Sequence, residues 1–177
     1  MMIRTGPVLV GVLLLGAAVT GHAQSRYGRR QERFPTVAVM GGPTRYDLGS
    51  KGTGFVAALR FDVPSGRIFV VEPGIAFARL RSATGARISY VLPEISLQVE
   101  PPRGAFRPYL GVGGGFAEYL SGRGTTYGTL HAAAGVRLNI GDHYGARFEV
   151  RARSIDPFSQ STTDFTFGFM KRLSPGR

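Results

Sequence analysis

Residues 146–154 read ARFEVRARS and alternate without a break between apolar and charged side chains. The apolar positions are Ala146, Phe148, Val150 and Ala152, and the charged positions are Arg147, Glu149, Arg151 and Arg153. A period of two predicts a β-strand with one apolar face and one charged face. In water the charged face points outward and the protein is a soluble β domain, whereas in lipid it points inward and the protein is a membrane barrel.

The N-terminus has the pattern of a secretory signal peptide. Arg4 supplies a positive charge, residues 8–19 form an apolar run, and Gly21 and Ala23 are small residues suited to a cleavage site. The run is too short to be a good membrane-spanning helix. We predict cleavage after Ala23, so that removing 23 of the 177 residues leaves 154, enough for one domain. Residues 24–34 are predicted to form a basic N-terminal leader, because they are polar and have no period.

The composition points to an exported, strongly basic protein without disulfides. The chain has no cysteine, so its stability must come from packing or from the backbone pairing of a closed sheet. It carries 22 Lys and Arg against 11 Asp and Glu, and all but two of the basic residues are arginine. Arginine suits bidentate contacts with phosphate and carboxylate. Since an exported protein rarely meets nucleic acid, we expect no nucleic-acid partner. Phosphorylated glycolipid is the expected acidic partner, and pairing of the arginines within the protein is the alternative.

Eight segments of period two follow, and no helical period lies between them. They cover residues 36–44, 54–63, 68–79, 88–100, 106–118, 127–140, 146–154 and 162–173. The motif Gly41-Gly42-Pro43 predicts a bend in the first. Tight turns are predicted at 64–67, 101–104 and 141–144, and longer loops at 48–53, 81–87, 121–126 and 156–161. Short turns at one end and longer loops at the other are typical of outer-membrane barrels, with both termini on the periplasmic side.

Side-chain size favours lipid on the outside. The polar faces are rich in Gly and Ala, such as Gly74, Ala76 and Gly111, whereas the opposite faces carry Phe, Leu, Val and Ile. The interior of an eight-stranded barrel holds only a modest volume of side chains, so small residues with a few long charged ones fit it. The main rival hypothesis is a soluble exported β-barrel that binds an apolar ligand.

Several motifs give the sequence a resemblance to a known family. RPYLGVGGG at 107–115 and AGVRL at 134–138, together with the signal peptide and the eight segments, resemble the small outer-membrane β-barrel proteins of the OmpA/OmpX type, which are porin-like. The resemblance implies an all-β, eight-stranded antiparallel up-and-down transmembrane barrel over residues 35–173, with a short tail at 174–177. It also implies a plugged polar lumen, a location in the outer membrane of a Gram-negative-type bacterium, and insertion by the barrel assembly machinery. The expected state is a monomer without a cofactor.

Charges on the inward faces predict a buried network. Its expected members are Arg60, Asp62, Glu72, Glu94, Arg137, Arg147, Glu149, Arg151, Arg153 and Asp164. We expect Glu94 opposite Gly74, and Arg153 close to Asp164. Glu72 and Glu94 could serve as a general acid and base, but enclosed arginines favour ion pairing. The segment 146–154 carries three arginines and one glutamate, so a bound anion is a hypothesis for this strand.

Little in the sequence indicates catalysis. A less favoured alternative is a lipid A-modifying enzyme, for which His131 lacks a nearby serine in the sequence and His143 lies in a predicted periplasmic turn. We therefore predict no catalytic residues, and no metal site, because no cluster has ligand spacing. Basic residues at the predicted loop end are candidates for contact with lipopolysaccharide phosphate, with a solvated charged rim as the alternative: Arg45, Lys51, Arg79, Arg81, Arg87 and Arg123.

Overall fold

The computed structural model describes residues 34–47, 51–81, 87–102, 104–120, 126–156 and 160–173. The predicted signal peptide, nearly all of the leader, the tail at 174–177 and Arg123 lie outside these residues. Eight strands make up the described part: β1 (Thr36–Asp47), β2 (Lys51–Pro64), β3 (Phe69–Arg81), β4 (Arg87–Val99), β5 (Phe106–Tyr119), β6 (Thr126–Ile140), β7 (Tyr144–Ile155) and β8 (Gln160–Arg172). No helix among these residues has the length and hydropathy to cross a bilayer.

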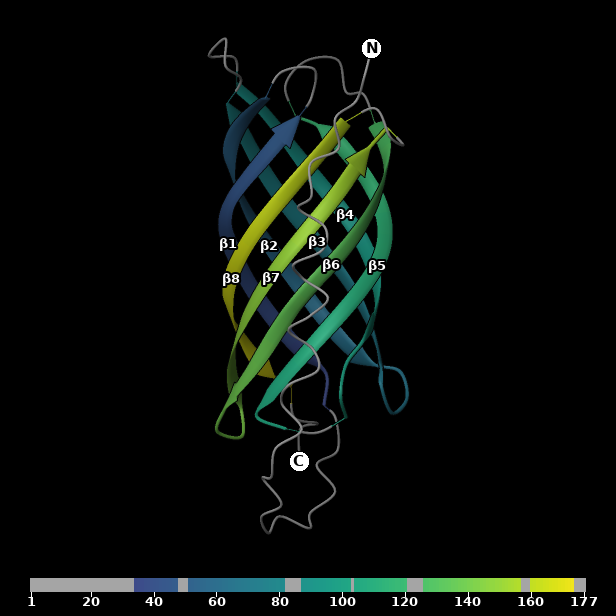
Figure 1. Cartoon of the computed structure of the whole chain (residues 1–177), viewed down its shortest axis with the longest axis vertical. Helices are drawn as coiled ribbons and strands as arrows, with labels where there is room; N and C mark the ends of the chain where they lie inside the picture. Colours follow the sequence, from purple (N-terminus) through teal and green to yellow (C-terminus); the bar gives the residue numbers. More distant parts are fainter. Residues whose placement is uncertain are drawn as a thin grey trace, which may run out of the picture. The chain divides into compact units, whose positions relative to one another are not determined.

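The strands form one closed antiparallel barrel in chain order, and β1 pairs with β8 to complete it (Figure 1). Closure leaves no edge strand, so the backbone groups pair within the sheet. Because the strand count is even, β1 begins and β8 ends at the same end of the barrel, which we call the turn end; it lies at the bottom of Figure 1. The opposite end is the loop end. The prediction of an eight-stranded up-and-down barrel is confirmed.

The predicted difference between the two ends is wrong. Three to six residues connect consecutive strands at the loop end, and three to six at the turn end. The strands at the loop end continue further than expected: β1 runs to Asp47 and β3 to Arg81. Polar and basic residues near these ends do not break the period of two, so the ladder includes them. Loop length therefore gives no orientation for this barrel.

The two faces of each strand differ sharply in exposure. On β7, Phe148 is 48% and Val150 44% exposed, whereas Arg147 is fully buried and Arg151 only 1% exposed. Other strands repeat the pattern, with exposed Phe55, Ile95 and Phe116 on the outside. The charged face of residues 146–154 thus points into the barrel. A soluble barrel that binds an apolar ligand requires the opposite arrangement.

Three prolines on the outer face coincide with interruptions in the hydrogen-bond ladders. Pairing skips Pro43 between β1 and β8, Pro73 between β2 and β3, and Pro93 between β4 and β5. Proline has no N–H to donate, so each interrupts the ladder locally. At Gly41-Gly42-Pro43, where the sequence predicts a bend, β1 continues and stays paired with β2. Only the pairing with β8 is lost there.

Candidate functional site

The main concentration of polar chemistry is an ionic network inside the barrel. In the described part of the chain, six arginines face six carboxylates. The arginines are Arg60, Arg107, Arg137, Arg147, Arg151 and Arg153, and the carboxylates are Asp62, Glu72, Glu94, Glu100, Glu149 and Asp164. The ten residues predicted for a lumen network are all among them. Equal numbers of opposite charges let the interior remain neutral without a bound ion.

Glu94 on β4 joins three strands at the middle of the network. It accepts hydrogen bonds from Arg151 Nη1 at 2.9 Å and from Arg153 Nη2 at 3.0 Å, and it pairs with Arg60. Gly74 lies directly opposite Glu94 on β3, as predicted, and its missing side chain leaves room for Arg60. Arg153 also pairs with Asp164 across the β7–β8 hairpin, as expected. The carboxylate is therefore surrounded by guanidinium groups and has no vacant face for proton transfer.

Glu149 is linked to the rest of β7 and to Tyr109. Arg147 Nη2 donates to Glu149 at 2.5 Å, Arg151 Nε donates at 2.8 Å, and the Tyr109 hydroxyl donates at 2.6 Å. The guanidinium of Arg147 lies 4.8 Å from the centre of the Tyr109 ring. The guanidinium of Arg137, which is on β6, lies 4.3 Å from the centre of the same ring. These contacts hold the long arginine side chains in fixed positions.

Carboxylates on other strands balance the excess positive charge of the arginines on β7. Arg151 Nη2 donates to Glu72 at 2.7 Å, and Arg147 pairs with both Glu72 and Asp62. The hypothesis of a bound anion on this strand is not needed, because acids on β2, β3, β4 and β8 supply the charge. The pattern along one strand could not reveal these partners.

Sequence reasoning left two ionic members out of the network. Glu100 and Arg107 flank the turn between β4 and β5, and Arg107 Nη1 donates to Glu100 at 3.1 Å. Glu100 also pairs with Arg137. Both residues have the inward position in the period of their segments and sit next to a predicted tight turn. That combination is a signal from which their pairing could have been found.

The structure also brings a serine to His131, although none is near it in the sequence. Ser96 Oγ on β4 and His131 Nε2 on β6 lie 2.7 Å apart, across Gly113 of β5. Arg151 Nη1 lies 3.3 Å from the same nitrogen. A guanidinium only donates, so Nε2 accepts and the ring proton sits on Nδ1. Nδ1 lies 3.4 Å from Glu94 Oε2 but forms no hydrogen bond with it.

This Ser–His–Glu arrangement resembles a hydrolase triad in composition but not in setting. Ser96 is 2% exposed and His131 6% exposed, so a substrate has no route to the hydroxyl in this conformation. A triad also needs its acid free to stabilise the protonated histidine. Glu94 is instead held by three arginines. We therefore interpret the Ser96–His131 contact as a polar bridge between β4 and β6.

Aromatic and aliphatic side chains fill the interior at the loop end. Tyr90 lies near the start of β4 and Tyr119 ends β5, and the Tyr90 hydroxyl donates to that of Tyr119 at 2.9 Å. The Tyr127 ring lies 5.5 Å from that of Tyr119. Buried Leu80 and Ile155 complete this layer. These side chains form a buried layer between the ionic network and the loop end.

The basic residues predicted at the loop end gather on one sector of the outer face. Arg45, Arg79, Arg81 and Arg87 are all exposed. One row of paired residues runs across β1 to β4 through Arg45, Thr53, Arg81 and Arg87. Lys51 begins β2 beside them, opposite Asp47. On β5, the same end of the outer face carries Glu118 instead, so among the described strands the exposed arginines of the loop end lie on β1, β3 and β4.

Among the described residues, no group of three or more His, Asp or Glu side chains has positions that could hold a metal ion. Carboxylates that are already bonded to arginine are also poor ligands for a cation.

Comparisons with known proteins bear on the fold. The sequence matches no protein-family model and no curated protein. Neisserial surface protein A (NspA) superposes with a TM-score of 0.57 at 12% identity, covering 78% of this chain and 97% of that one. Ail, the attachment invasion locus protein of Yersinia pestis, superposes with a TM-score of 0.53 at 15% identity, covering 80% of this chain and 100% of that one. The chain has the fold of the small outer-membrane barrels.

Another small outer-membrane barrel with this fold is PagL, which is described as an outer membrane enzyme. It superposes with a TM-score of 0.52 at 13% identity, covering 78% of this chain and 99% of that one. The predicted resemblance to the OmpA/OmpX type is therefore confirmed for the fold. At such low identities the likeness carries no activity across, because one fold hosts many functions.

The Arg153–Asp164 pair provides a direct test of the network. We expect Asp164→Ala to lower the free energy of unfolding by about 3 kcal/mol, because it leaves Arg153 partly uncompensated in the interior. Asp142→Ala, in the exposed turn between β6 and β7, is the matched control and should change it by less than about 0.5 kcal/mol. Urea titrations in lipid vesicles measure both values. Equal midpoints for the two variants would argue against the pair.

Proposed function

We propose that the protein is an outer-membrane β-barrel with a sealed polar lumen and a structural or surface-interaction role in the cell envelope. The observation that carries this proposal is the inverted polarity of the barrel. Large apolar side chains cover the outer face, and the charges are paired inside. Burying apolar surface is the main favourable term for such a protein in lipid, whereas the same surface in water would drive aggregation.

The sealed lumen is the part of this proposal that electrical recording tests. Purified protein inserted into planar bilayers should give no stepwise conductance, because the ionic network and the tyrosine layer fill the interior. A general porin in the same bilayers is the positive control. Reproducible steps from this protein that survive repurification would contradict a sealed lumen.

We propose that the chain is a monomer that the barrel assembly machinery inserts after the signal peptide is removed. The start of β1 and the end of β8 then lie on the periplasmic side, since insertion proceeds from there, and the loop end faces the outside of the cell. Phe165, Phe167 and Phe169 give the outer face of β8 an alternating aromatic pattern, although the strand continues past Phe169 to Lys171 and Arg172.

We propose no enzymatic activity. A fluorophosphonate probe, which labels activated serines, should leave the folded protein unlabelled, because Ser96 is buried and Glu94 is held by arginines. An active serine hydrolase in the same mixture is the control. Labelling of the folded protein that disappears in Ser96→Ala, or lipid A hydrolysis that disappears in His131→Ala, would establish catalysis.

The basic sector of β1–β4 supports contact with lipopolysaccharide phosphates. Its arginines lie on the outer face at the loop end, which in the proposed orientation is the level of the outer-leaflet headgroups. Arginine binds phosphate through two parallel hydrogen bonds. Arg81→Gln combined with Arg87→Gln should weaken lipid A binding about tenfold or more. Arg67→Gln, in the exposed turn between β2 and β3, should have no effect, and an equal loss in both variants would point to general electrostatics.

A further inference from the structure

Two hollows follow one another on the outer face where β1 and β8 close the barrel. The first, of about 340 Å³, is apolar and is lined mainly by Pro43, Phe148, Val150, Phe165 and Phe167. The second, of about 440 Å³, is lined mostly by residues with polar side chains and lies nearer the loop end, and we call it the polar hollow. Both volumes fall in the range of small-molecule sites, roughly 300–1,000 Å³.

The strand register makes the two hollows neighbours along β1 and β8, and we call the pair the track. On β1 the outward positions are Gly41, Pro43 and Arg45, in steps of two toward the loop end. On β8 the residues opposite are Phe167 next to Gly41 and Thr163 next to Arg45. The track therefore runs from the middle of the apolar face to the level of the basic sector.

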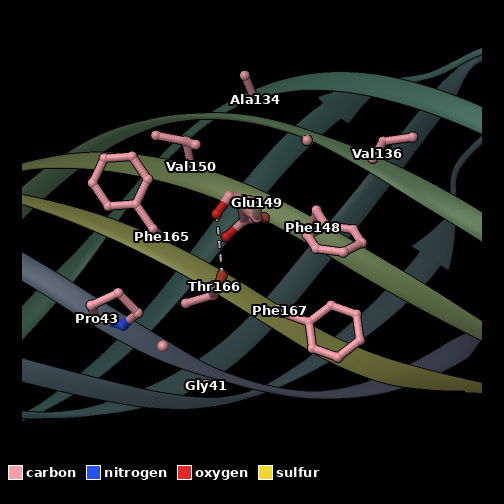
Figure 2. A pocket seen from close by; sticks show the side chains of 12 residues that line it. Gly41, Pro43, Ala134, Val136, Phe148, Glu149, Val150, Phe165, Thr166 and Phe167 are labelled. Carbon is pink, nitrogen blue, oxygen red and sulfur yellow. Dashed lines mark hydrogen bonds between the residues drawn. The ribbon is translucent and has the colours of Figure 1, made fainter.

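Small side chains and a ring of aromatic groups shape the apolar hollow. Gly41 and Ala134 leave space, and Figure 2 shows the rings of Phe148, Phe165 and Phe167 spread around the segment of Glu149 and Thr166. Glu149 is 4% exposed and its carboxylate is bonded to Arg147 and Arg151, so the hollow offers mainly apolar contact. Such a hollow at the middle of a membrane strand suits a hydrocarbon chain.

The polar hollow combines groups that recognise a phosphorylated sugar. The residues that line it include Arg45, Asp47, Thr53, Ser161 and Thr163. The guanidinium suits a phosphate, and the carboxylate and hydroxyls suit the hydroxyl groups of a sugar. A glycerophospholipid would also use the guanidinium through its phosphate, but its headgroup offers fewer hydroxyl groups to the carboxylate and to the threonine and serine side chains than a sugar does. Arg81, which pairs with Thr53 in the register, adds positive charge beside the hollow.

We propose that this track binds one outer-leaflet glycolipid, with its phosphorylated sugar at Arg45 and one acyl chain between the phenylalanines. The proposal rests on the proposed function, since it requires the barrel to be in the outer membrane with the loop end outward. It goes beyond a general basic rim because it assigns a single lipid to the seam and gives the acyl chain its own site.

The absence of tryptophan from the chain allows a clean spectroscopic test. Phe165→Trp places a reporter in the apolar hollow, and Phe116→Trp places a control on the exposed outer face of β5. Each variant is folded into vesicles of dibrominated phosphatidylcholine, whose bromine atoms quench tryptophan in contact with lipid. Unbrominated lipid A with two phosphates is then titrated in. We expect fluorescence at position 165 to recover at an about tenfold lower fraction of lipid A than at position 116.

Further variants separate the two parts of the site. Arg45→Gln should abolish the difference between the two reporters, whereas Arg67→Gln, at the turn end, should preserve it. Ala134→Leu, which fills the apolar hollow, should also reduce the difference, and Ala132→Leu, on the same face of β6 but outside the lining, should not.

Two outcomes overturn the inference while leaving the proposed function intact. In both, the two reporters are quenched by brominated lipid. In the first, the fluorescence of the two reporters recovers equally as lipid A is added. In the second, unbrominated phosphatidylglycerol, titrated in place of lipid A, protects position 165 as well as lipid A does. A third outcome, with neither reporter quenched, would mean that the outer face is not in lipid, and the proposed function itself would fail. The three outcomes are distinguishable in one experiment.

Discussion

Replacing Arg151 by methionine should lower the free energy of unfolding by about 3–5 kcal/mol, the typical cost of removing one partner of a buried ion pair. Arg151 links the contacts around Glu94 to those around Glu149, because it pairs with Glu72, Glu94 and Glu149. Methionine fills a similar volume along the stem, so the loss reports on charge more than on packing. Urea unfolding in lipid vesicles, followed by gel mobility, measures the change.

Two further variants keep this prediction specific. Arg67→Met, at an exposed turn, should lie within about 0.5 kcal/mol of the unaltered protein. Adding Glu149→Gln to Arg151→Met should recover part of the lost stability, because it restores the balance of charge in the interior. An Arg151→Met protein as stable as the unaltered one would show that the network contributes little.

Gly113→Ala should also be strongly destabilising, by about 3 kcal/mol, although it adds a single methyl group. Its Cβ would lie 2.1 Å from the Ile95 carbonyl oxygen and 2.6 Å from His131 Nε2. The added atom therefore enters the space in which Ser96 and His131 meet across β5. Either the strands separate or the bridge between β4 and β6 breaks.

Gly128→Ala is the matched control for this substitution. Gly128 lies on the outer face of β6, and a Cβ there would have no neighbour within 4 Å. Its stability should change by less than about 1 kcal/mol, and in the stabilising direction, because alanine reduces the freedom of the unfolded chain. Equal losses at positions 113 and 128 would mean that glycine in a strand, rather than the bridge, sets the effect.

The fold could be predicted because its signal is local. Each strand has its own alternation of apolar and polar residues. Residues 146–154 alone separate an apolar face from a charged face within nine positions. The residues that face the lumen could be predicted because alternate positions along a strand face the same side. Gly74 could be placed opposite Glu94 because their hairpin has few possible registers. The Arg153–Asp164 contact, across one hairpin, was predictable for the same reason.

Contacts between non-adjacent strands could not be predicted from the sequence. The contact of Ser96 with His131 passes over β5 and exists because Gly113 has no side chain, which no single segment reveals. Besides Glu149 on its own strand, Arg147 pairs with acids on β2 and β3, which are not neighbours of β7 in the strand order. Strand ends were also misjudged, since polar residues such as Arg45 and Arg81 continue the ladder past the apolar belt.

The central claim is that the apolar face of this barrel lies in the outer membrane and the charged face lies inside the protein. Cell fractionation combined with gel mobility tests it most directly. The claim predicts that the protein is recovered with outer membranes, needs detergent for extraction, and migrates faster before boiling than after, because a closed barrel stays compact in the gel. Recovery of folded protein from the periplasmic fluid without detergent would contradict it.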